Sequence, residues 1–486
     1  MKYYVIAYKY SRFRNVINLG DDMQSLAIED MLKQLSIEED QLDYIARSEM
    51  GVRNPSREKG IFIPATGGLA WNTYPAKEDL PINDYNLRVL YFGTRIPEGM
   101  FDAMRHYDAF IASMKKYEPI GCRDVATRDY LRSLGIKAFF TKCVSLGLDY
   151  RDKDVKGNKI FIVDIPDNIN DIIKESMPSK LLEKTEYLRQ KMNAPSSARG
   201  QMSDNDALYI NQLAKERLDL YKHEAMLVIT SRIHVAMPCA AMGIPVIFYD
   251  KANNSRSAVV SSVLTPYTKE MIKQFDWNNL KATDISETKR ELKLLFNYRL
   301  QQEELKMGLK TQRLSEKEFK EAGDLLDLRC REEEPKNTYT PQIFSTTAMV
   351  TALLGDKKEE VARLSRPVVL FGAGDLSRRL LVILRRYGIN PVCFCDNKIS
   401  KEETAWHENL PLISFEKLSK NHKNSYVIIS TSEAEDQITA SEVEDQIRSQ
   451  LLQHGFNDDY IIDCKDYYSL YFEYLPPPIV YGSDFM

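Results

Sequence analysis

Residues 224–250 read EAMLVITSRIHVAMPCAAMGIPVIFYD. The apolar runs 224–230 and 244–250 have the length and composition of buried strands, and the segment between them is typical of a short helix that Gly243 closes. A strand, a helix and a strand in this order predict one βαβ unit of a parallel sheet with a right-handed crossover. The same alternation continues through most of the chain, which predicts an α/β protein with parallel sheets.

Side chains that attract anions interrupt this apolar unit. Ser231, Arg232 and His234 stand where the first strand ends and the helix begins, and Lys251 follows the second strand. The carboxyl ends of parallel strands share one edge of a sheet, and open α/β sheets bind ligands at that edge. A lone histidine or lysine is more often structural, but their convergence at one edge favours function. We therefore predict a phosphate or carboxylate site made by Ser231, Arg232, Lys251 and helix N-terminal amides, with His234 placed for proton transfer.

Two other segments place a glycine-containing turn before a helix. In NVINLGDDMQSLA, Asp21 or Asp22 is expected to cap the helix, and Asp21 is also a candidate base. In YEPIGCRDVATRDYLRSLGIKAFF, Asp124 is expected to cap a helix that Gly135 closes, with Arg123 pointing outward beside the helix N-terminus. Both segments therefore repeat the arrangement that suits an anion or a sugar hydroxyl.

The ordered set of these segments resembles the polysaccharide pyruvyl transferase family. The resemblance is carried by NLGDDMQSLA, by PIGCRDVATRDYL followed by GIKAFFTKCVSLGL, and by ITSRIHVAMPCAAMGIPVIFYDK, which together span roughly the first half of the chain. It implies a GT-B-like pair of Rossmann-like domains facing a cleft. It also implies that a pyruvyl group moves from phosphoenolpyruvate to hydroxyls of a sugar, giving a ketal and phosphate without a required cofactor or metal. The donor-site arginine, histidine and lysine of the family fall on Arg123, His234 and Lys251.

The acceptor side of such a site would belong to the N-terminal domain. Its candidate residues are Asn18, Gly20 and Asp22 in the first motif, and Trp71 in the glycine-rich stretch ATGGLAWNTYP. The acceptor would be a sugar or a lipid-linked oligosaccharide of a capsule, exopolysaccharide or cell-wall glycan precursor. Two alternatives stay open: a GT-B glycosyltransferase that uses a nucleotide sugar, and a non-catalytic nucleotide-sensing protein of glycan assembly. An arginine and a lysine at one sheet edge suit a small dianion better than a nucleotide sugar.

A different glycine pattern lies in RPVVLFGAGDLSRRLLVILRRYGINPVCFCDNK. Gly372 and Gly374 match the first two glycines of a dinucleotide-binding fingerprint, Ser377 replaces the third, and Asp396 stands where a ribose-binding acid is expected. We predict a Rossmann-like domain here. It holds a nucleotide, or it is a degenerate regulatory site, or its fold is retained for packing; the last two together are preferred.

The predicted organisation has five parts in chain order. They are an N-terminal Rossmann-like domain on the acceptor side (1–150), a second Rossmann-like domain on the donor side (151–300), a charged helical linker (301–365), a C-terminal Rossmann-like domain (366–470) and a proline-containing tail (471–486).

Composition narrows the class of protein. The chain has 486 residues, 43% of them hydrophobic and 28% charged, which is typical of globular proteins. A formal net charge of -4 argues against nucleic acid as a partner. Seven cysteines without a CxxC pair favour reduced thiols, no metal and a cytoplasmic location. The sequence leaves open a peripheral association with the inner face of a membrane and a homo-oligomer.

Overall fold

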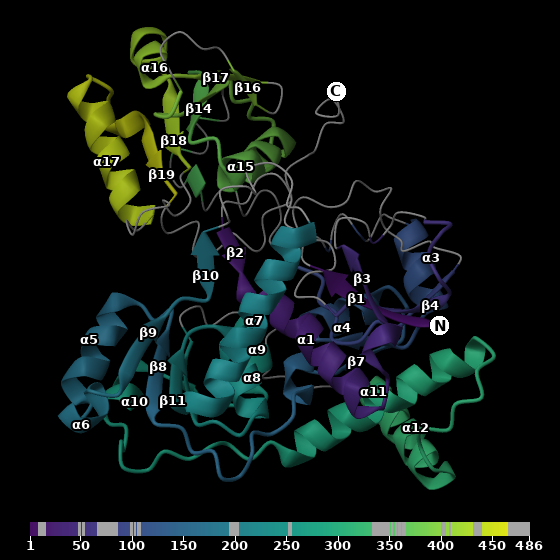
Figure 1. Cartoon of the computed structure of the whole chain (residues 1–486). Helices are drawn as coiled ribbons and strands as arrows, with labels where there is room; N and C mark the ends of the chain where they lie inside the picture. The colour runs from purple at the N-terminus through teal and green to yellow at the C-terminus, as the bar shows by residue number, and fades with distance from the viewer. Residues whose placement is uncertain are drawn as a thin grey trace. The chain divides into compact units, whose positions relative to one another are not determined.

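The computed structural model divides into two compact units (Figure 1). Unit 1 comprises Met1–Leu69, Tyr74–Ile96 and Ala103–Pro341, and unit 2 comprises Ala70–Thr73, Pro97–Asp102 and Gln342–Met486. The structure describes residues 1–7, 16–46, 50, 54–65, 86–97, 101, 104, 108–193, 204–250, 255–332, 350, 353–354, 357, 361, 366–399, 405–407, 410–430 and 440–464.

The first sheet of unit 1 has four parallel strands. Their order is β3 (Leu42–Ala46), β1 (Lys2–Ala7), β4 (Gly60–Ile63) and β5 (Leu87–Val89). Two more parallel strands, β6 (Ile120–Cys122) and β7 (Ala138–Phe140), run beside the chain that leaves β5, since Gly121 N–H donates to the Tyr91 carbonyl at 3.0 Å. The apolar strand cores, such as YYVI of β1, are buried.

The second sheet of unit 1 contains the βαβ unit predicted from residues 224–250, which is confirmed. Strand β11 (Ala225–Thr230), helix α8 (Ile233–Ala241) and strand β12 (Val246–Tyr249) follow one another, and the two strands pair in parallel. The five parallel strands have the order β13 (Pro266–Tyr267), β12, β11, β8 (Lys159–Val163) and β9 (Thr185–Leu188). The strand order reverses direction between β8 and β11, which is where doubly wound sheets bind ligands.

A short ribbon connects the second sheet to the start of the first long helix. Strand β10 (Lys191–Asn193) pairs antiparallel with β2 (Val16–Asn18), and β2 leads directly into α1 (Leu19–Gln34). Helix α7 (Asp204–Glu224) packs along α1, and the two lie side by side in Figure 1. The tip of α1 is therefore held close to the second sheet.

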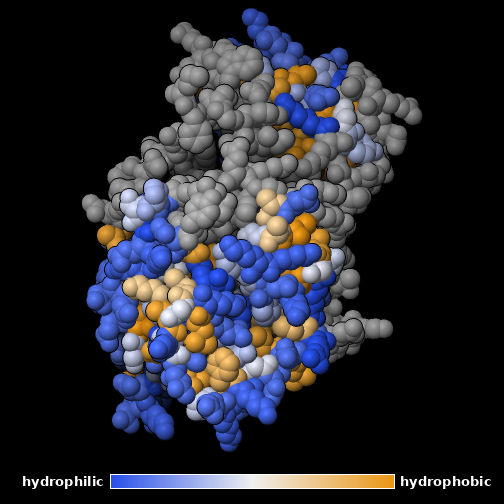
Figure 2. Space-filling view, turned by 90° about the vertical axis from the view of Figure 1, so that its right-hand side faces the viewer, coloured by the Kyte–Doolittle hydropathy of each residue, from blue (hydrophilic) through white to orange (hydrophobic). Residues whose placement is uncertain are grey.

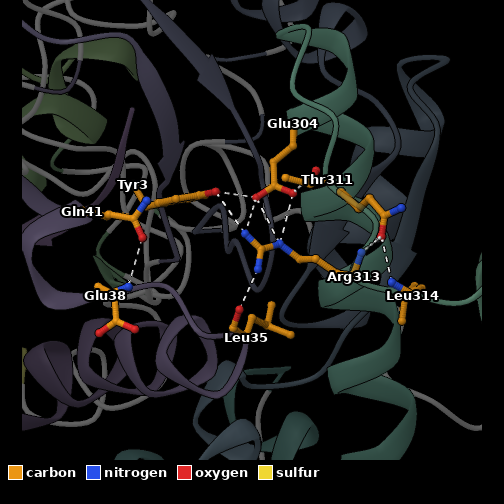
Figure 3. Close-up of polar contacts among 9 residues, drawn as sticks. Tyr3, Leu35, Glu38, Gln41, Glu304, Thr311, Arg313 and Leu314 are labelled. Atoms are coloured by element: carbon orange, nitrogen blue, oxygen red, sulfur yellow. Dashed lines mark hydrogen bonds and ion pairs between the residues drawn. The ribbon is translucent and has the colours of Figure 1, made fainter.

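Helix α11 (Ser286–Lys306) is followed by α12 (Glu316–Arg331). We expected the charged helical linker 301–365 to be a solvated spacer or bracket. The solvation is wrong for the end of α11, where Glu303 and Glu304 are fully buried. Figure 3 shows the reason. The Glu304 carboxylate accepts hydrogen bonds from Tyr3 of β1, Thr311 and Arg313, so its buried charge has partners. Glu303 pairs with Arg88 and Lys306.

The same arginine joins three parts of unit 1. Arg313 Nη2 lies 2.9 Å from the Glu304 carboxylate, and its Nη1 donates to the carbonyl of Leu35, the residue that ends α1, at 2.6 Å. Burial and the neighbouring Glu304 raise the pKa of Tyr3. A segment that looks like a linker by composition is thus a bracket between β1, α1 and α11.

Unit 1 has eight further helices among its described residues. They are η1 (Glu39–Gln41), α3 (Asp108–Lys116), α4 (Val125–Ser133), η4 (Val144–Gly147), α5 (Asp167–Ser176), α6 (Ser179–Leu182), α9 (Ser255–Ser261) and α10 (Lys269–Lys273).

Unit 2 is a six-stranded sheet with helices. The strand order is β16 (Ala405–His407), β17 (Leu410–Ile413), β15 (Cys393–Cys395), β14 (Val368–Phe371), β18 (Tyr426–Ile429) and β19 (Ile461–Asp463), and only the edge strand β16 is antiparallel. Its helices are α15 (Asp375–Arg386), α16 (Phe415–Asn421), α17 (Ala440–Gln453) and η7 (Asp458–Tyr460). Cys393 and Cys395 of β15 are core residues.

The α/β class with parallel sheets is confirmed, whereas the GT-B-like pairing and the nucleotide-binding character of unit 2 stay predictions. The predicted boundary near residue 150 falls between the two sheets, inside unit 1. The predicted tail 471–486 lies outside the described residues. On the face of the molecule in Figure 2, hydrophilic and hydrophobic residues are interspersed. None of the helices in the described parts of the chain is long and apolar enough to cross a membrane.

Candidate functional site

His234 stands at a kink in α8. Its φ of -82° and ψ of 20° are not helical, although the residues that follow it continue the helix. Pro238 explains the kink, because it lacks the N–H that would bond to the carbonyl four residues earlier, and its ring crowds that carbonyl. The carbonyl in question is that of His234, so the sequence of the helix itself bends the backbone at the candidate proton carrier.

The His234 side chain meets Arg123 in the interior of unit 1. Arg123 Nη1 lies 3.3 Å from His234 Nε2, and only 1% of Arg123 and 5% of His234 are exposed. The expectation that Arg123 points outward is wrong, because this residue follows β6 and turns inward toward α8. The residue after it, Asp124, caps α4 as expected by accepting from Thr127 N–H at 2.8 Å, and it also pairs with the buried Arg95.

The hydrogen-bond partners decide which nitrogen of His234 carries a proton. A guanidinium can only donate, so Nε2 must accept from Arg123 and the imidazole is neutral, with its proton on Nδ1. Nδ1 lies 3.9 Å from the Cys143 sulfur, which in turn lies 2.9 Å from the Ser145 hydroxyl. These contacts place the His234 proton on the Cys143 side and the His234 lone pair on the arginine side.

The tip of α1 packs directly against His234. A Cβ atom on Gly20 would lie 2.6 Å from the His234 Cβ, so only glycine allows this close approach. Our expectation that Asp21 or Asp22 caps α1 is wrong, because Asn18 occupies the cap and its side chain accepts from Gly20 N–H at 3.2 Å. Asp21 Oδ1 accepts from Asn18 Nδ2 at 3.3 Å, so the candidate base is held at the helix tip.

Asp22 differs from its neighbour by being buried. Burial, and then the nearby Asp21 carboxylate, raise the pKa of Asp22 well above its usual range. The two adjacent carboxyls are thus unequal, since Asp21 is partly exposed and Asp22 has been removed from water.

A second cluster lies where the second sheet reverses its strand order. Asp164 directly follows β8, and its Oδ2 accepts from Arg232 Nε at 2.7 Å and from Gln190 N–H at 3.3 Å. Ser231 Oγ donates to the Asp164 carbonyl at 2.6 Å. The sequence reasoning named Ser231 and Arg232 but missed Asp164, although KIFIVD shows an acid directly after a buried strand at the same predicted edge.

Two predicted residues, Lys251 and Trp71, lie outside the described residues. The structure shows instead a lysine that the sequence reasoning missed. Lys142 follows β7 between Thr141, which donates to the Cys122 carbonyl, and Cys143, which contacts His234. Its φ is +64°, in the left-handed region that a lysine seldom occupies.

In unit 2, the predicted nucleotide residues lie at strand ends. Gly372 has a φ of +111° directly after β14, and Gly374 stands before α15 as its exposed N-cap. Asp396 follows β15, and its carboxylate accepts from Lys398 N–H at 2.9 Å. Ser377, which replaces the third glycine, is buried and donates to the Ser430 carbonyl at 2.9 Å. A nucleotide in this unit stays a prediction.

Among the described residues, no three histidine, cysteine or acidic side chains lie close enough together to share a metal ion. All seven cysteines are free. The site of unit 1 thus defines a class: an α/β protein that combines an arginine-bound neutral imidazole with cations and a carboxylate at the edges of parallel sheets.

The comparison with protein families makes this class specific. Residues 18–251 match the model of the polysaccharide pyruvyl transferase family, the family that the motifs suggested. The match indicates a transferase with a role in pyruvyl transfer in polysaccharide biosynthesis. It contains Arg123, His234 and Asp164, the centres of both clusters.

Two solved structures show weaker similarity. A functionally uncharacterised protein of Klebsiella pneumoniae subsp. pneumoniae NTUH-K2044 is 18% identical over 55% of this chain and 90% of its own, with a TM-score of 0.33. A candidate phosphosugar isomerase of Clostridium difficile 630 is 12% identical over 68% of this chain and 89% of its own, with a TM-score of 0.16. These TM-scores are too low for either similarity to carry an argument. No curated protein matches the chain.

Proposed function

We propose that the protein moves the pyruvyl group of phosphoenolpyruvate onto two hydroxyls of a sugar and releases phosphate. The acceptor would be a sugar or lipid-linked oligosaccharide in a capsule, exopolysaccharide or cell-wall glycan precursor. One observation carries the proposal: the buried contact between Arg123 and His234, inside the segment that matches the pyruvyl transferase family model. The family match favours this reaction over transfer from a nucleotide sugar.

Phosphoenolpyruvate presents a carboxylate and a phosphate on adjacent groups, and fixed cations recognise such a pair. Arg123 and Arg232 are the described candidates, from β6 and β11 respectively. Lys142 joins them in this proposal because its strained backbone stands beside Cys143, a contact of His234. Lys251 keeps its proposed donor role from the family resemblance.

The reaction needs two proton movements that balance. A proton adds to the methylene carbon of the enol, a sugar hydroxyl oxygen bonds to C2, and the C2–O bond to phosphate breaks. The second hydroxyl then bonds to C2 and closes the ketal. The two hydroxyl protons end on the new methyl group and on the phosphate, so no external oxidant, reductant or metal enters the balance.

His234 suits the transfer of these protons. Because Nε2 accepts from Arg123, the imidazole begins without a proton there. When Arg123 turns to the bound anion, Nε2 can take a proton from a sugar hydroxyl and return it to the methylene carbon or to the departing phosphate. A neighbouring dianion favours the imidazolium that forms in between.

The tip of α1 is the proposed acceptor side. Gly20 lies against His234, Asn18 caps the same helix, and Asp21 is hydrogen-bonded to Asn18. In this proposal Asp21 is a second base for the acceptor hydroxyls, and Asp22 supports the same helix turn from the interior. Trp71 retains its proposed role as a stacking platform for the sugar.

The test is phosphate release from phosphoenolpyruvate with galactose-, glucose- and mannosamine-type acceptors. We expect acceptor-dependent release and a pyruvate ketal on the acceptor by mass spectrometry, both lost in Arg123→Lys because lysine cannot form the same fork. The matched control is Arg290→Lys, an exposed arginine paired with Glu287 and Glu321. Absence of release with every acceptor, together with no calorimetric binding of phosphoenolpyruvate, would contradict the proposal.

A further inference from the structure

We propose that Asp164 is a positioning residue: it orients Arg232 toward the anionic groups of the donor and ties that arginine to the acceptor-side helix tip. The inference rests on the proposed function and deepens it, because it assigns a residue that neither the motifs nor the family resemblance named. Three contacts of Asp164 support the inference. They lie at the edge of the second sheet where its strand order reverses.

The first contact fixes one end of the guanidinium. Arg232 Nε donates to Asp164 Oδ2 at 2.7 Å, with 36% of the arginine side chain and 11% of the aspartate side chain exposed. Among the described residues, the two Nη groups of Arg232 make no polar contact within hydrogen-bond distance. A guanidinium held at Nε presents both Nη groups as a fork, which is the geometry that binds a carboxylate or phosphate with two hydrogen bonds.

The second and third contacts join Asp164 to its surroundings. Gln190 N–H donates to the same Oδ2 at 3.3 Å, and the Gln190 carbonyl accepts from Leu19 N–H at 3.2 Å, at the first residue of α1. Ser231 Oγ donates to the Asp164 carbonyl at 2.6 Å. One carboxylate therefore links the start of α8, which carries Arg232 and His234, to the start of α1, which carries Gly20.

The backbone of Asp164 supports a functional role. Only Ser36, Lys142 and Asp164 among the described non-glycine residues have a positive φ. Ser36 has an ordinary reason: it follows the end of α1, and the next residue, Ile37, returns a hydrogen bond to the Leu32 carbonyl, as in a Schellman ending. Asp164, with a φ of +49°, ends a strand instead. Such conformations persist where surrounding contacts hold them, and they cluster at functional sites.

The decisive variant is Asp164→Asn. Asparagine tolerates the left-handed conformation and can still accept from Gln190 N–H, but it removes the charge that holds Arg232. We expect calorimetric affinity for phosphoenolpyruvate to fall roughly 10-fold, with a matching rise in KM and kcat within about 2-fold, because a charge-assisted hydrogen bond is lost. The control is Glu186→Gln, which removes a carboxylate paired with Lys159 on the same sheet and should leave the affinity unchanged.

A double-mutant cycle separates positioning from general stability. If Asp164 acts through Arg232, then Asp164→Asn adds nothing to the affinity loss of Arg232→Gln. Guanidinium ion at millimolar concentration should partly restore Arg232→Ala but not the double variant Arg232→Ala with Asp164→Asn. A structural role would instead give additive losses in both backgrounds and equal rescue.

The outcomes are distinct. If the wild-type protein neither binds phosphoenolpyruvate nor releases phosphate from it, the proposed function fails and this inference falls with it. If the wild-type protein binds phosphoenolpyruvate but Asp164→Asn binds equally well, or if the losses are additive, only the role of Asp164 is overturned. An affinity loss confined to the background that contains Arg232 supports the inference.

Discussion

The second sheet of unit 1 and the sheet of unit 2 both reverse their strand order next to their first strand. The side chains at the strand ends beside the reversal differ between the two sheets. Between β8 and β11, the strand ends carry Asp164 and Arg232, a charged pair with a partly exposed guanidinium. Between β14 and β18, the Ser377 and Ser430 hydroxyls lie 2.8 Å apart, both buried. One edge offers ionic groups to a ligand, and the other satisfies its polar groups internally.

This difference shows that the fold positions an edge where a ligand can bind, and that the side chains at this edge determine whether and what it binds. A doubly wound sheet of either kind predicts a ligand at the reversal. In unit 2, Ser377 replaces the third glycine of the fingerprint, and its hydroxyl donates to the Ser430 carbonyl directly after β18. That contact favours the packing or regulatory interpretation of unit 2 over a dinucleotide site.

The largest expected effect comes from His234→Gln. We expect acceptor-dependent phosphate release to fall by ~100-fold or more, because a glutamine amide cannot carry the proton. Thermal unfolding should stay close to that of the wild-type protein, since glutamine can still hydrogen-bond to Arg123. The control His223→Gln changes an exposed histidine on α7 that contacts the Asp219 carbonyl. A near-wild-type rate for His234→Gln would show that His234 does not transfer a proton in the reaction.

Gly372→Ala tests the edge of unit 2. A Cβ atom there would lie 2.8 Å from the Ser430 carbonyl oxygen, at a backbone φ of +111°, so we expect unfolding of unit 2 to become easier by about 2 kcal/mol. Gly388 has a φ of +92° but open space around an added Cβ. Gly388→Ala therefore measures the backbone strain alone, and the difference between the two variants measures the clash. Urea unfolding monitored by hydrogen exchange gives the two values. A catalytic rate that falls in Gly372→Ala but not in Gly388→Ala would mean that the edge of unit 2 also serves the reaction.

A substitution of Lys289 tests how well the C-terminal end of α8 is shielded from water. The Lys289 ammonium donates to the carbonyl of Ala241, the last residue of α8, at 3.0 Å, and burial lowers the pKa of Lys289 to about 8. Between this pKa and the ordinary lysine value, the unfolded chain binds more protons than the folded one, so stability rises with pH in that window. The free energy of unfolding of the wild-type protein, minus that of Lys289→Met, should rise by about 1 kcal/mol from pH ~8 to pH ~10 after allowance for solvent screening.

Urea titrations at several pH values measure this difference. The exposed Lys269→Met is the matched control, and its difference should stay flat across the same range. A flat difference for Lys289→Met as well would show that the lysine is fully hydrated in the folded protein, and that the end of α8 is more open than its contacts indicate.

The smallest expected effect compares two strained residues. Lys142→Gly and Ser36→Gly should each stabilise unit 1 by about 0.5 kcal/mol, because glycine relieves the positive φ at some cost in chain entropy. Only Lys142→Gly should weaken binding of phosphoenolpyruvate, by a few-fold, since Ser36 only follows the end of α1. Thermal unfolding and calorimetry on the same samples provide both numbers. Equal binding by the two variants would assign Lys142 to structure.

Local features of this protein were predictable from its sequence. The βαβ unit follows from two apolar runs around a helical pattern, and the Asp124 cap and the turn at Gly135 follow from the residues themselves. The start of α1 was predicted wrongly because three capping residues stand close together in NLGDD, and the close approach of Gly20 to His234 favours the earliest of them, Asn18. The burial of Glu303 and Glu304 was missed because a charged segment looks solvated until its partners are known.

The elements, the order of the motifs and the residue types that can bind an anion or carry a proton follow from the local sequence. Which of these residues meet follows from the packing of the core. Arg123 and His234 are 111 residues apart, and Asp164 and Arg232 are 68 residues apart. Secondary structure depends on neighbours within a few residues, whereas these pairs depend on which sheet edges the packing of the core brings together. The neutral form of His234 and the orientation of Arg232 follow from those distant contacts and from nothing local.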